Sequence, residues 1–254
     1  MPNVLILGGT MEARRLAERL AGRSDLTVTL SLAGRTAHPA ALPVPVRSGG
    51  FGGVAGLVDY LKAERIDALI DATHPYAAVI SANAAQAARI TGVPLLALRR
   101  QSWAKVDGDR WTEVADMNEA VHALGDKPRR VFLALGRKEV APFAQAPQHH
   151  YLVRSVDPID PPLAVPHAEY IRARGPFSED DERALLADRG IDVIVSKNSG
   201  GSATYGKIAA ARALGIGVVV LRRPTLPDVP SVETVDAALA WLDHALAPQA
   251  ARGV

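Results

Sequence analysis

The sequence predicts an α/β protein made of two doubly wound, Rossmann-like parallel-sheet halves, with the active site in the cleft between them. Three observations lead to this prediction. Short runs rich in Val, Ile and Leu alternate with helical patterns along the chain, which is typical of βαβ units with buried parallel strands. The length of 254 residues exceeds the usual size of one domain. The two halves also share strand patterns at nearly constant offsets.

The first half is expected to form an NADP-binding domain over residues 1–100. Its elements, in chain order, are a strand at Val4–Leu7, a helix at Glu12–Ala21, strands at Leu26–Leu32 and Val44–Arg47, a helix at Val54–Glu64, a strand at Ala68–Asp71, a helix at Val79–Thr91 and a strand at Pro94–Leu98. The following stretch, Gln101–Asp109, contains a tryptophan, a glycine and several charges without clear periodicity. We expect it to be a linker.

The second half is expected to form a substrate-binding domain over residues 110–246. Strands are expected at Arg110–Val114, Val131–Leu135, Tyr151–Val156, Ala168–Arg172, Asp192–Ser196 and Val218–Leu221, and helices at Met117–Leu124, Glu179–Asp188, Ala203–Leu214 and Val232–Leu246. The proline-rich stretch Asp157–Pro166 cannot lie inside a sheet. The tail beyond Ala247 is expected to be disordered.

An internal repeat supports two similar halves. Ile191-Asp192 follows Ile66-Asp67 by 125 residues, and Arg223 follows Arg100 by 123. The strand Val4–Gly8 aligns with Val131–Gly136 at an offset near 127. Buried parallel strands converge on similar compositions, which is the alternative explanation. The shared Ile-Asp and Arg-Arg pairs favour a repeat.

The composition excludes several classes of protein. A net charge of +2 and 48% hydrophobic residues are typical of an ordinary globular protein and too weakly basic to indicate nucleic-acid binding. The absence of cysteine excludes disulfides and thiolate metal sites. No apolar run approaches the ~20 residues of a membrane span, and the first residues do not resemble a signal peptide. We therefore expect a cytoplasmic protein without membrane or nucleic-acid partners.

A glycine turn after the first strand is the first candidate binding motif. Gly8, Gly9 and Thr10 stand between the strand and the next helix, where glycines permit a tight turn and let a pyrophosphate approach the helix N-terminus. The motif is a variant of the full dinucleotide fingerprint. A turn that serves only as a connection is the alternative.

The end of the second strand indicates which dinucleotide is bound. An NAD site places Asp or Glu there to hold the ribose 2′-OH, whereas this sequence has Ser31 and Arg35 and no carboxylate. Both side chains could hold a 2′-phosphate that a carboxylate would repel. NADPH is therefore the expected cofactor, although Arg35 could also be a solvated loop residue.

Two further loops are expected beside the cofactor. The loop after the fourth strand contains Asp71, Ala72 and Thr73 followed by His74 and Tyr76; the imidazole and the phenol are candidate catalytic groups, and His74 could also contact the substrate. Alternatively, the residues from Asp71 to Thr73 only cap the next helix.

A glycine-dense loop follows the third strand. It contains Gly50, Phe51 and Gly52, where the lack of side chains on the glycines would let the backbone pack against the cofactor. A flexible surface loop is the alternative.

The second half carries basic residues at the corresponding strand ends. In place of a second glycine, Gly136 is followed by Arg137 and Lys138, which suit carboxylates better than a pyrophosphate. A Gly-rich loop leads into the helix that contains Lys207, and such a turn is a candidate anion site. The substrate-binding candidates in this loop are Lys197, Asn198, Ser199, Gly200, Gly201 and Thr204. An ordinary capped turn with solvated lysines is the alternative.

Taken together, three motifs resemble the precorrin-6A reductase (precorrin-6x reductase) family of cobalamin biosynthesis. They are the glycine turn with Glu12-Ala13-Arg14, the loop Asp71–Tyr76, and Lys197–Gly201. No motif residue departs from the family pattern, and the resemblance runs from the first strand to the last helix. It implies NADPH-dependent reduction of a C=C bond of the tetrapyrrole precorrin-6A to give precorrin-6B, without a metal.

Some questions stay open at the level of sequence. The proton that accompanies the hydride could come from His74, from Tyr76 or from solvent. Another NADP-dependent oxidoreductase acting on a small anionic substrate is an alternative, although no Tyr-x-x-x-Lys pair of the short-chain class is present. A nonenzymatic NADP sensor is a second alternative. The oligomeric state, the face of hydride transfer and retention of product are not predicted.

Overall fold

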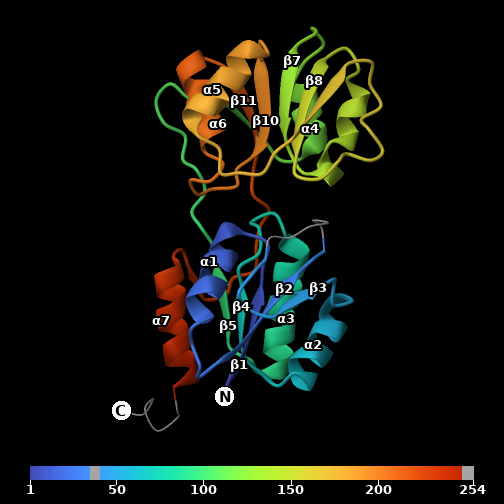
Figure 1. Cartoon of the computed structure of the whole chain (residues 1–254). Helices are drawn as coiled ribbons and strands as arrows, with labels where there is room; N and C mark the ends of the chain where they lie inside the picture. Colours follow the sequence, from blue (N-terminus) through green and yellow to red (C-terminus); the bar gives the residue numbers. More distant parts are fainter. Residues whose placement is uncertain (35–40, 248–254) are drawn as a thin grey trace. The chain divides into compact units, whose positions relative to one another are not determined.

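The computed structural model describes residues 1–34 and 41–247. These residues fold as two compact units (Figure 1): unit 1 comprises Met1–Gln101 with the C-terminal segment from Pro224, and unit 2 comprises Ser102–Arg223. The expected role of Arg35 and the expected disorder of the tail beyond Ala247 lie outside the described residues.

Unit 1 contains a parallel sheet with the strand order β12-β5-β4-β1-β2-β3. Its elements are β1 (Asn3–Leu7), α1 (Met11–Leu20), β2 (Thr27–Leu32), β3 (Val46–Ser48), α2 (Gly53–Ala63), β4 (Ile66–Asp71), α3 (Ala78–Thr91), β5 (Leu95–Leu98), β12 (Ser231–Val232) and α7 (Val235–Leu246). The strand order reverses beside β1, so the crevice at its carboxyl end is the place where such sheets bind ligands.

Helices cover both faces of this sheet, as Figure 1 shows. Val4 and Ile6 of β1 belong to a core shared with α1 and α7, whereas Leu5 and Leu7 belong to a second core shared with α2 and α3. Successive residues of a strand point to opposite faces. A strand covered on both sides must therefore be apolar throughout, which explains the continuous apolar run of β1.

Unit 2 contains a second parallel sheet, with the order β6-β11-β10-β7-β8-β9. Its elements are β6 (Trp111–Val114), α4 (Met117–Ala123), β7 (Arg130–Ala134), the 3₁₀ helices η1 (Arg137–Glu139) and η2 (Ala141–Gln145), β8 (His150–Ser155), β9 (Ala168–Arg172), α5 (Glu179–Asp188), β10 (Val193–Lys197), α6 (Gly206–Leu214) and β11 (Gly217–Leu221). Two short 3₁₀ helices thus follow β7, where a full α-helix follows β1 in unit 1.

The internal repeat is confirmed by strand order and by hydrogen bonding. The backbone N–H of Asn3 donates to the Asp67 carboxylate over 2.7 Å, and the backbone N–H of Arg130 donates to the Asp192 carboxylate over the same distance. Each bond ties the start of the central strand to the start of the strand beside it. The aspartates of the repeated Ile-Asp pairs therefore accept equivalent backbone hydrogen bonds in both units.

The predicted domain boundaries differ from the observed units in two ways. The expected linker is largely part of unit 2, because Trp103 is buried in the core of that unit. The expected second domain, 110–246, ends instead at Arg223, because β12 pairs with β5 and α7 buries Ala238 and Leu242 in unit 1. Conversely, β6 follows β5 in the chain but pairs with β11 in unit 2.

Most element boundaries differ from expectation by one to three residues, and three of the shifts have a clear structural basis. The strand expected at Val44–Arg47 is Val46–Ser48, and Pro45 precedes it because proline has no N–H for the ladder. The helix expected from Ala203 begins at Gly206, after a turn. The last helix begins at Val235 with Thr234 as its N-cap, because Ser231–Val232 form β12.

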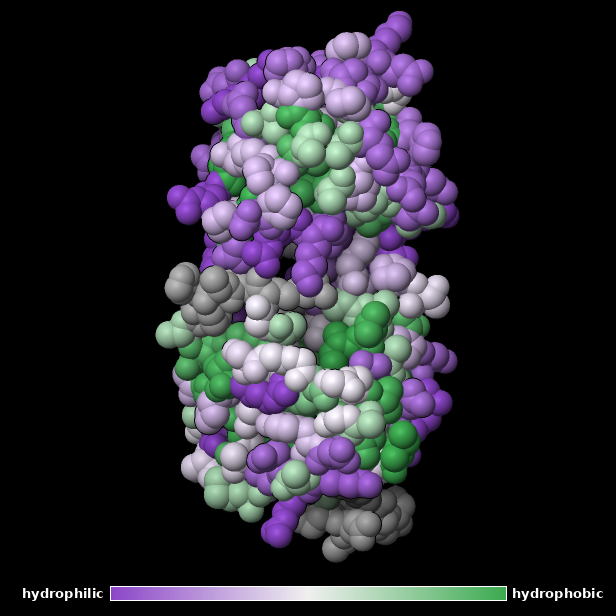
Figure 2. Space-filling view, turned by 90° about the vertical axis from the view of Figure 1, so that its right-hand side faces the viewer, coloured by the Kyte–Doolittle hydropathy of each residue, from purple (hydrophilic) through white to green (hydrophobic). Residues whose placement is uncertain are grey.

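The side of the molecule shown in Figure 2 mixes hydrophilic and apolar side chains over both units. Within residues 1–34 and 41–247, no helix has both the length and the apolar character that crossing a bilayer requires. The long apolar segments of the sequence are instead the strands and helices that form the cores of the two units.

Candidate active site

The glycine turn after β1 is open toward solvent. Gly9 has a φ of +125°, which favours glycine, and a Cβ placed there would meet nothing within 4 Å. Gly8 is more closely packed, because a Cβ there would lie 2.7 Å from the end of the Leu30 side chain, which would have to shift. No acceptor among the described residues takes the backbone N–H of Gly9 or Thr10. The turn therefore leaves donors and space at the N-terminus of α1.

Thr10 joins this turn to the loop after β4. Its hydroxyl accepts from the Ala13 N–H over 3.1 Å, as an N-cap, and donates to the Ala72 carbonyl over 2.8 Å. Asp71 is 4% exposed and accepts from both the N–H and the hydroxyl of Thr73, over 3.1 and 2.6 Å. The Asp71 carboxylate and the Ala72 methyl are thus buried and shape the loop, so a direct side-chain contact with a cofactor is not supported for either.

His74 and Tyr76 lie together in the same loop. Their rings are 5.6 Å apart, and the Tyr76 N–H donates to the His74 Nδ1 over 3.3 Å. Since Nδ1 accepts this bond, the neutral imidazole carries its proton on Nε2. Both side chains are partly buried. The loop therefore presents an imidazole and a phenol beside each other, and their catalytic role stays a prediction.

An arginine that sequence reasoning missed borders the expected 2′-phosphate position. Arg47, on β3, lies 3.2 Å from the buried Ser31 hydroxyl and donates to the carbonyls of Gly49 and Gly50, over 2.7 Å each. Its guanidinium also lies 3.9 Å from the centre of the Phe51 ring. A signal was present in the sequence, because an arginine precedes the glycine-dense loop directly. Gly50 and Phe51 thus belong to one cluster with Ser31.

Strand register identifies which residues of unit 2 correspond to the glycine turn. Leu7 pairs with Asp71 in unit 1, and Ala134 pairs with Ser196 in unit 2. Two residues beyond these pairs, Gly136 of unit 2 corresponds to Gly9 of unit 1. The sequence had suggested that Gly136 corresponds to Gly8. Arg137 then stands where unit 1 has its N-cap threonine.

Unlike the turn of unit 1, this second turn is closed by its own carboxylate. The Gly136 N–H donates to the Glu139 Oε2 over 2.6 Å, and the Lys197 amine donates to Oε1 over 2.5 Å. Lys197 is therefore engaged in an ion pair, which the sequence analysis did not foresee. Arg137 and Lys138 remain exposed beside this turn.

Side chains of other segments of unit 2 hydrogen-bond to the carbonyls of the Gly-rich loop after β10. The Arg223 guanidinium donates to the carbonyls of Asn198 and Ser199, over 2.9 and 3.1 Å, and the Trp103 indole donates to the Gly201 carbonyl over 2.7 Å. The Asn198 amide also exchanges two hydrogen bonds with the Trp103 backbone, over 2.8 and 2.9 Å.

With the carbonyls held in this way, a run of backbone donors is left over. No acceptor among the described residues takes the N–H groups from Gly200 to Thr204. Gly200 and Gly201 have φ values of +69° and +67°, which only glycine adopts readily. Successive unpaired N–H groups in such a turn form an anion-binding concavity. The backbone of this loop therefore has a geometry that suits an anion, and substrate binding by the loop stays a prediction.

Lys207 does not have the exposed position that a substrate contact requires. It is 4% exposed, and its amine donates to the Thr204 carbonyl over 2.7 Å and lies 4.9 Å from the centre of the Trp103 ring. Burial, reinforced by the nearby Arg154 charge, lowers the pKa of the amine to about 7, while Glu182 opposes the shift. Lys207 holds the loop in place from inside the core.

The comparisons with known proteins agree with this arrangement. The family model described as "Precorrin-6x reductase CbiJ/CobK" matches residues 3–243. The chain belongs to the precorrin-6x reductase family. A precorrin-6A reductase of Sinorhizobium sp is 59% identical over 97% of this chain and 95% of its own length, and one of Mycobacterium tuberculosis is 44% identical over 95% and 98%.

A solved structure supports the same family and fold. The structure titled "CobK precorrin-6A reductase" is 48% identical, covers 97% of this chain and 98% of its own, and has a TM-score of 0.92. The expected family and the two parallel-sheet halves are thus confirmed. As a member of a reductase family the protein is an oxidoreductase of cobalamin biosynthesis, and a nicotinamide cofactor follows from that membership.

Proposed function

We propose that this protein reduces a C=C bond of precorrin-6A with NADPH, giving precorrin-6B. The contrast between the two glycine turns is the observation that carries the proposal. In unit 1 the donors around Gly9 have open space in front of them, whereas in unit 2 the Glu139 carboxylate already accepts the donor of Gly136. Of these two turns among the described residues, the one in unit 1 is therefore the better candidate for a pyrophosphate. Unit 1 then holds the dinucleotide, and unit 2 is left for an anionic substrate.

The residues at the ends of β2 and β3 support NADPH over NADH. Ser31 and Arg47 stand there together, and neither strand ends in a carboxylate. Among the described residues at these two strand ends, there is therefore no acidic side chain to hold a free ribose 2′-OH and repel a 2′-phosphate. A guanidinium and a hydroxyl are the groups that stabilise a phosphate at this position. Since the reaction consumes NADPH, we place the enzyme in the cytoplasm.

The bound nicotinamide would supply a hydride to one carbon of the double bond, and a proton must reach the neighbouring carbon. His74 is one candidate source: it would have to act as the imidazolium, which releases a proton and becomes the neutral ring, and in that charged form its Nδ1 would not accept the Tyr76 N–H. The Tyr76 phenol and solvent are the other two sources. Thr10 contributes by fixing the loop through its bond to the Ala72 carbonyl, so that the imidazole keeps its position relative to the glycine turn.

In unit 2, the substrate carboxylates would bind the N–H run from Gly200 to Thr204 and the exposed cations Arg137 and Lys138. Backbone donors that are fixed in advance lose little conformational entropy when a carboxylate binds. The two exposed cations add attraction that salt weakens. Ser199 and Thr204 supply hydroxyls beside the same run.

The test is direct turnover. The protein is mixed with precorrin-6A and NADPH, or with NADH, and the absorbance of the macrocycle and of the reduced nicotinamide are followed together. We expect equimolar consumption of both and a clear preference for NADPH. Loss of neither absorbance would contradict the proposed reaction, whereas equal rates with both cofactors would contradict only the NADPH assignment.

A further inference from the structure

A concave surface at the carboxyl end of β9 lies outside the residues considered so far. It has a volume of about 580 Å³ and is lined by Val156, Tyr170, Ile171, Arg172, Ala173 and Arg174. Ligand pockets in proteins have volumes of roughly 300 to 1,000 Å³. The region is shallow and largely open to solvent, so it could contact only one part of a ligand.

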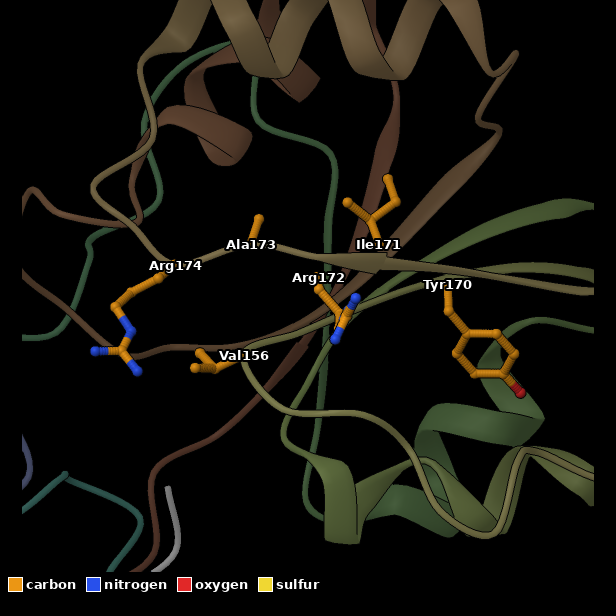
Figure 3. A pocket seen from close by; sticks show the side chains of 6 residues that line it. All are labelled: Val156, Tyr170, Ile171, Arg172, Ala173 and Arg174. Atoms are coloured by element: carbon orange, nitrogen blue, oxygen red, sulfur yellow. The ribbon is translucent and has the colours of Figure 1, made fainter. Parts of the chain in front are cut away.

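The strand pattern directs one set of side chains toward this surface. Ile171 packs into the core beneath α5 and α6, so its neighbours Tyr170 and Arg172 point to the opposite face of β9. Figure 3 shows the Arg172 guanidinium flanked by the side chains of Val156 and Tyr170. The Tyr170 hydroxyl accepts from the Leu163 N–H over 2.8 Å, which fixes the phenol ring. A cation is thus framed by an apolar side chain and an oriented aromatic ring.

The charge of Arg172 is not compensated. Arg154, on the neighbouring strand β8, forms a buried ion pair with Glu182. By contrast, no ion pair of residues 1–34 and 41–247 involves Arg172, which is exposed. A guanidinium has five N–H donors and no acceptor, so these donors are available to an external anion.

The position of Arg172 in the sheet relates it to the other donors of unit 2. The strands are parallel, so the carboxyl ends of β10, β7, β8 and β9 share one edge, in that order. At about 4.8 Å per strand, β9 lies roughly 14 Å from β10. Arg172 therefore stands at one end of a row whose other end is the loop after β10, with Arg137 and Lys138 after β7 between them.

We propose that Arg172 forms a separate carboxylate subsite of unit 2, for a second acidic side chain of the same substrate. The guanidinium would bind that carboxylate in a bidentate manner, and Tyr170 and Val156 would contact the apolar atoms next to it. Arg172 is thus a residue that determines specificity for a substrate with carboxylates far apart. The inference rests on the proposed function for the identity of the substrate.

The experiment measures binding without turnover. The dissociation constant of precorrin-6A is obtained by absorbance titration in the absence of NADPH, for the unaltered protein and for Arg172→Ala, at about 20 mM and about 500 mM salt. The Debye length falls from roughly 20 Å to roughly 4 Å between these conditions. We expect Arg172→Ala to weaken binding about three- to fivefold at low salt, as for an exposed ion pair, and much less at high salt. Arg172→Lys should recover part of the loss.

Arg129→Ala is the matched control. Arg129 is also exposed and cationic, but it immediately precedes β7, at the amino edge of the same sheet. Its removal changes the net charge equally and should leave the dissociation constant unchanged. Equal constants for Arg172→Ala and the unaltered protein at low salt, or equal losses in Arg172→Ala and Arg129→Ala, would overturn the subsite. Failure to oxidise NADPH in the separate turnover assay would overturn the proposed reaction alone.

Discussion

Gly9→Ala separates the backbone role of this glycine from its role in binding. A φ of +125° is unfavourable for alanine, and such strain costs about 1–3 kcal/mol. The added methyl meets no atom within 4 Å in the free protein, so no steric clash adds to that cost. For a chain of this length, the expected loss corresponds to a decrease in Tm of roughly 2–12 °C. The methyl would, however, occupy the space in front of the donors of the turn.

Gly9→Ala should also weaken NADPH binding, and by more than the backbone strain alone would cause. Losing one or two charge-assisted hydrogen bonds to a pyrophosphate costs about 1.5–3 kcal/mol each, so we expect the Kd for NADPH to rise at least tenfold. The assays are thermal unfolding and titration of NADPH fluorescence.

Gly92→Ala is the control, because Gly92 ends α3 with a φ of +75° and also has open space around it. It should lower the Tm in a similar way and leave the Kd unchanged. If both variants bound NADPH like the unaltered protein, the dinucleotide would not lie against this turn.

Three further predictions concern residues that the structure brought into view. Arg47→Ala should raise the Kd for NADPH about tenfold more than that for NADH, because a 2′-phosphate loses a charged partner; fluorescence titration with both cofactors measures the ratio. Trp103→Phe removes the donor to the Gly201 carbonyl and should raise the KM for precorrin-6A about three- to tenfold, with the Kd for NADPH unchanged. Burial is the main reason that the pKa of Lys207 is lowered from 10.5 to about 7. Between pH 7 and pH 10.5 the amine is therefore neutral in the folded protein and takes up a proton on unfolding. The free energy of unfolding should consequently rise with pH over this range. Lys207→Met should flatten that rise, as measured by urea unfolding across this range.

For each of these predictions, a control variant or a contradicting outcome can be stated. Equal losses of NADPH and NADH affinity in Arg47→Ala would assign the arginine to shaping the glycine loop through the carbonyls of Gly49 and Gly50. Trp241→Phe, in α7 of unit 1, should leave the KM for precorrin-6A unchanged. An unaltered pH dependence of stability in Lys207→Met would show that the buried amine is not the group that titrates.

Most of the fold followed from local pattern, because buried parallel strands and capped helices leave strong signals in the sequence. The strand at Val4–Leu7 is apolar throughout because two cores cover it. The helix expected at Glu179–Asp188 has those bounds, with Ser178 as its N-cap. The placement of the last strand did not follow. Ser231–Val232 is too short to carry a pattern, and its pairing with β5 depends on contacts more than 120 residues apart in the chain.

The candidate site was predicted at the level of loops and less well at the level of single side chains. The glycine turn and the loop around Gly200 have the backbone geometry that their composition suggested. The partners Glu139 and Arg223 were missed because ion pairs and carbonyl contacts between distant loops have no signature in a single sequence. Lys207 was misplaced for a related reason: a lysine is seldom fully buried, so its pattern alone gave no reason to expect it inside the core.

Two equivalent glutamates with different partners explain how a repeated architecture can bind two different ligands. Register matches Glu12 of unit 1 with Glu139 of unit 2, and each forms an ion pair, with Arg100 and Lys197 respectively. In unit 2, however, the Glu139 carboxylate also accepts the Gly136 N–H, because the short helix η1 brings Glu139 back onto the turn. In unit 1, the longer helix α1 begins after its N-cap threonine, and the backbone donors of the turn stay free. A dinucleotide would have to displace a carboxylate from unit 2 and would meet no such competitor in unit 1. The same sheet can therefore bind a cofactor in one copy and remain available for a polycarboxylate in the other.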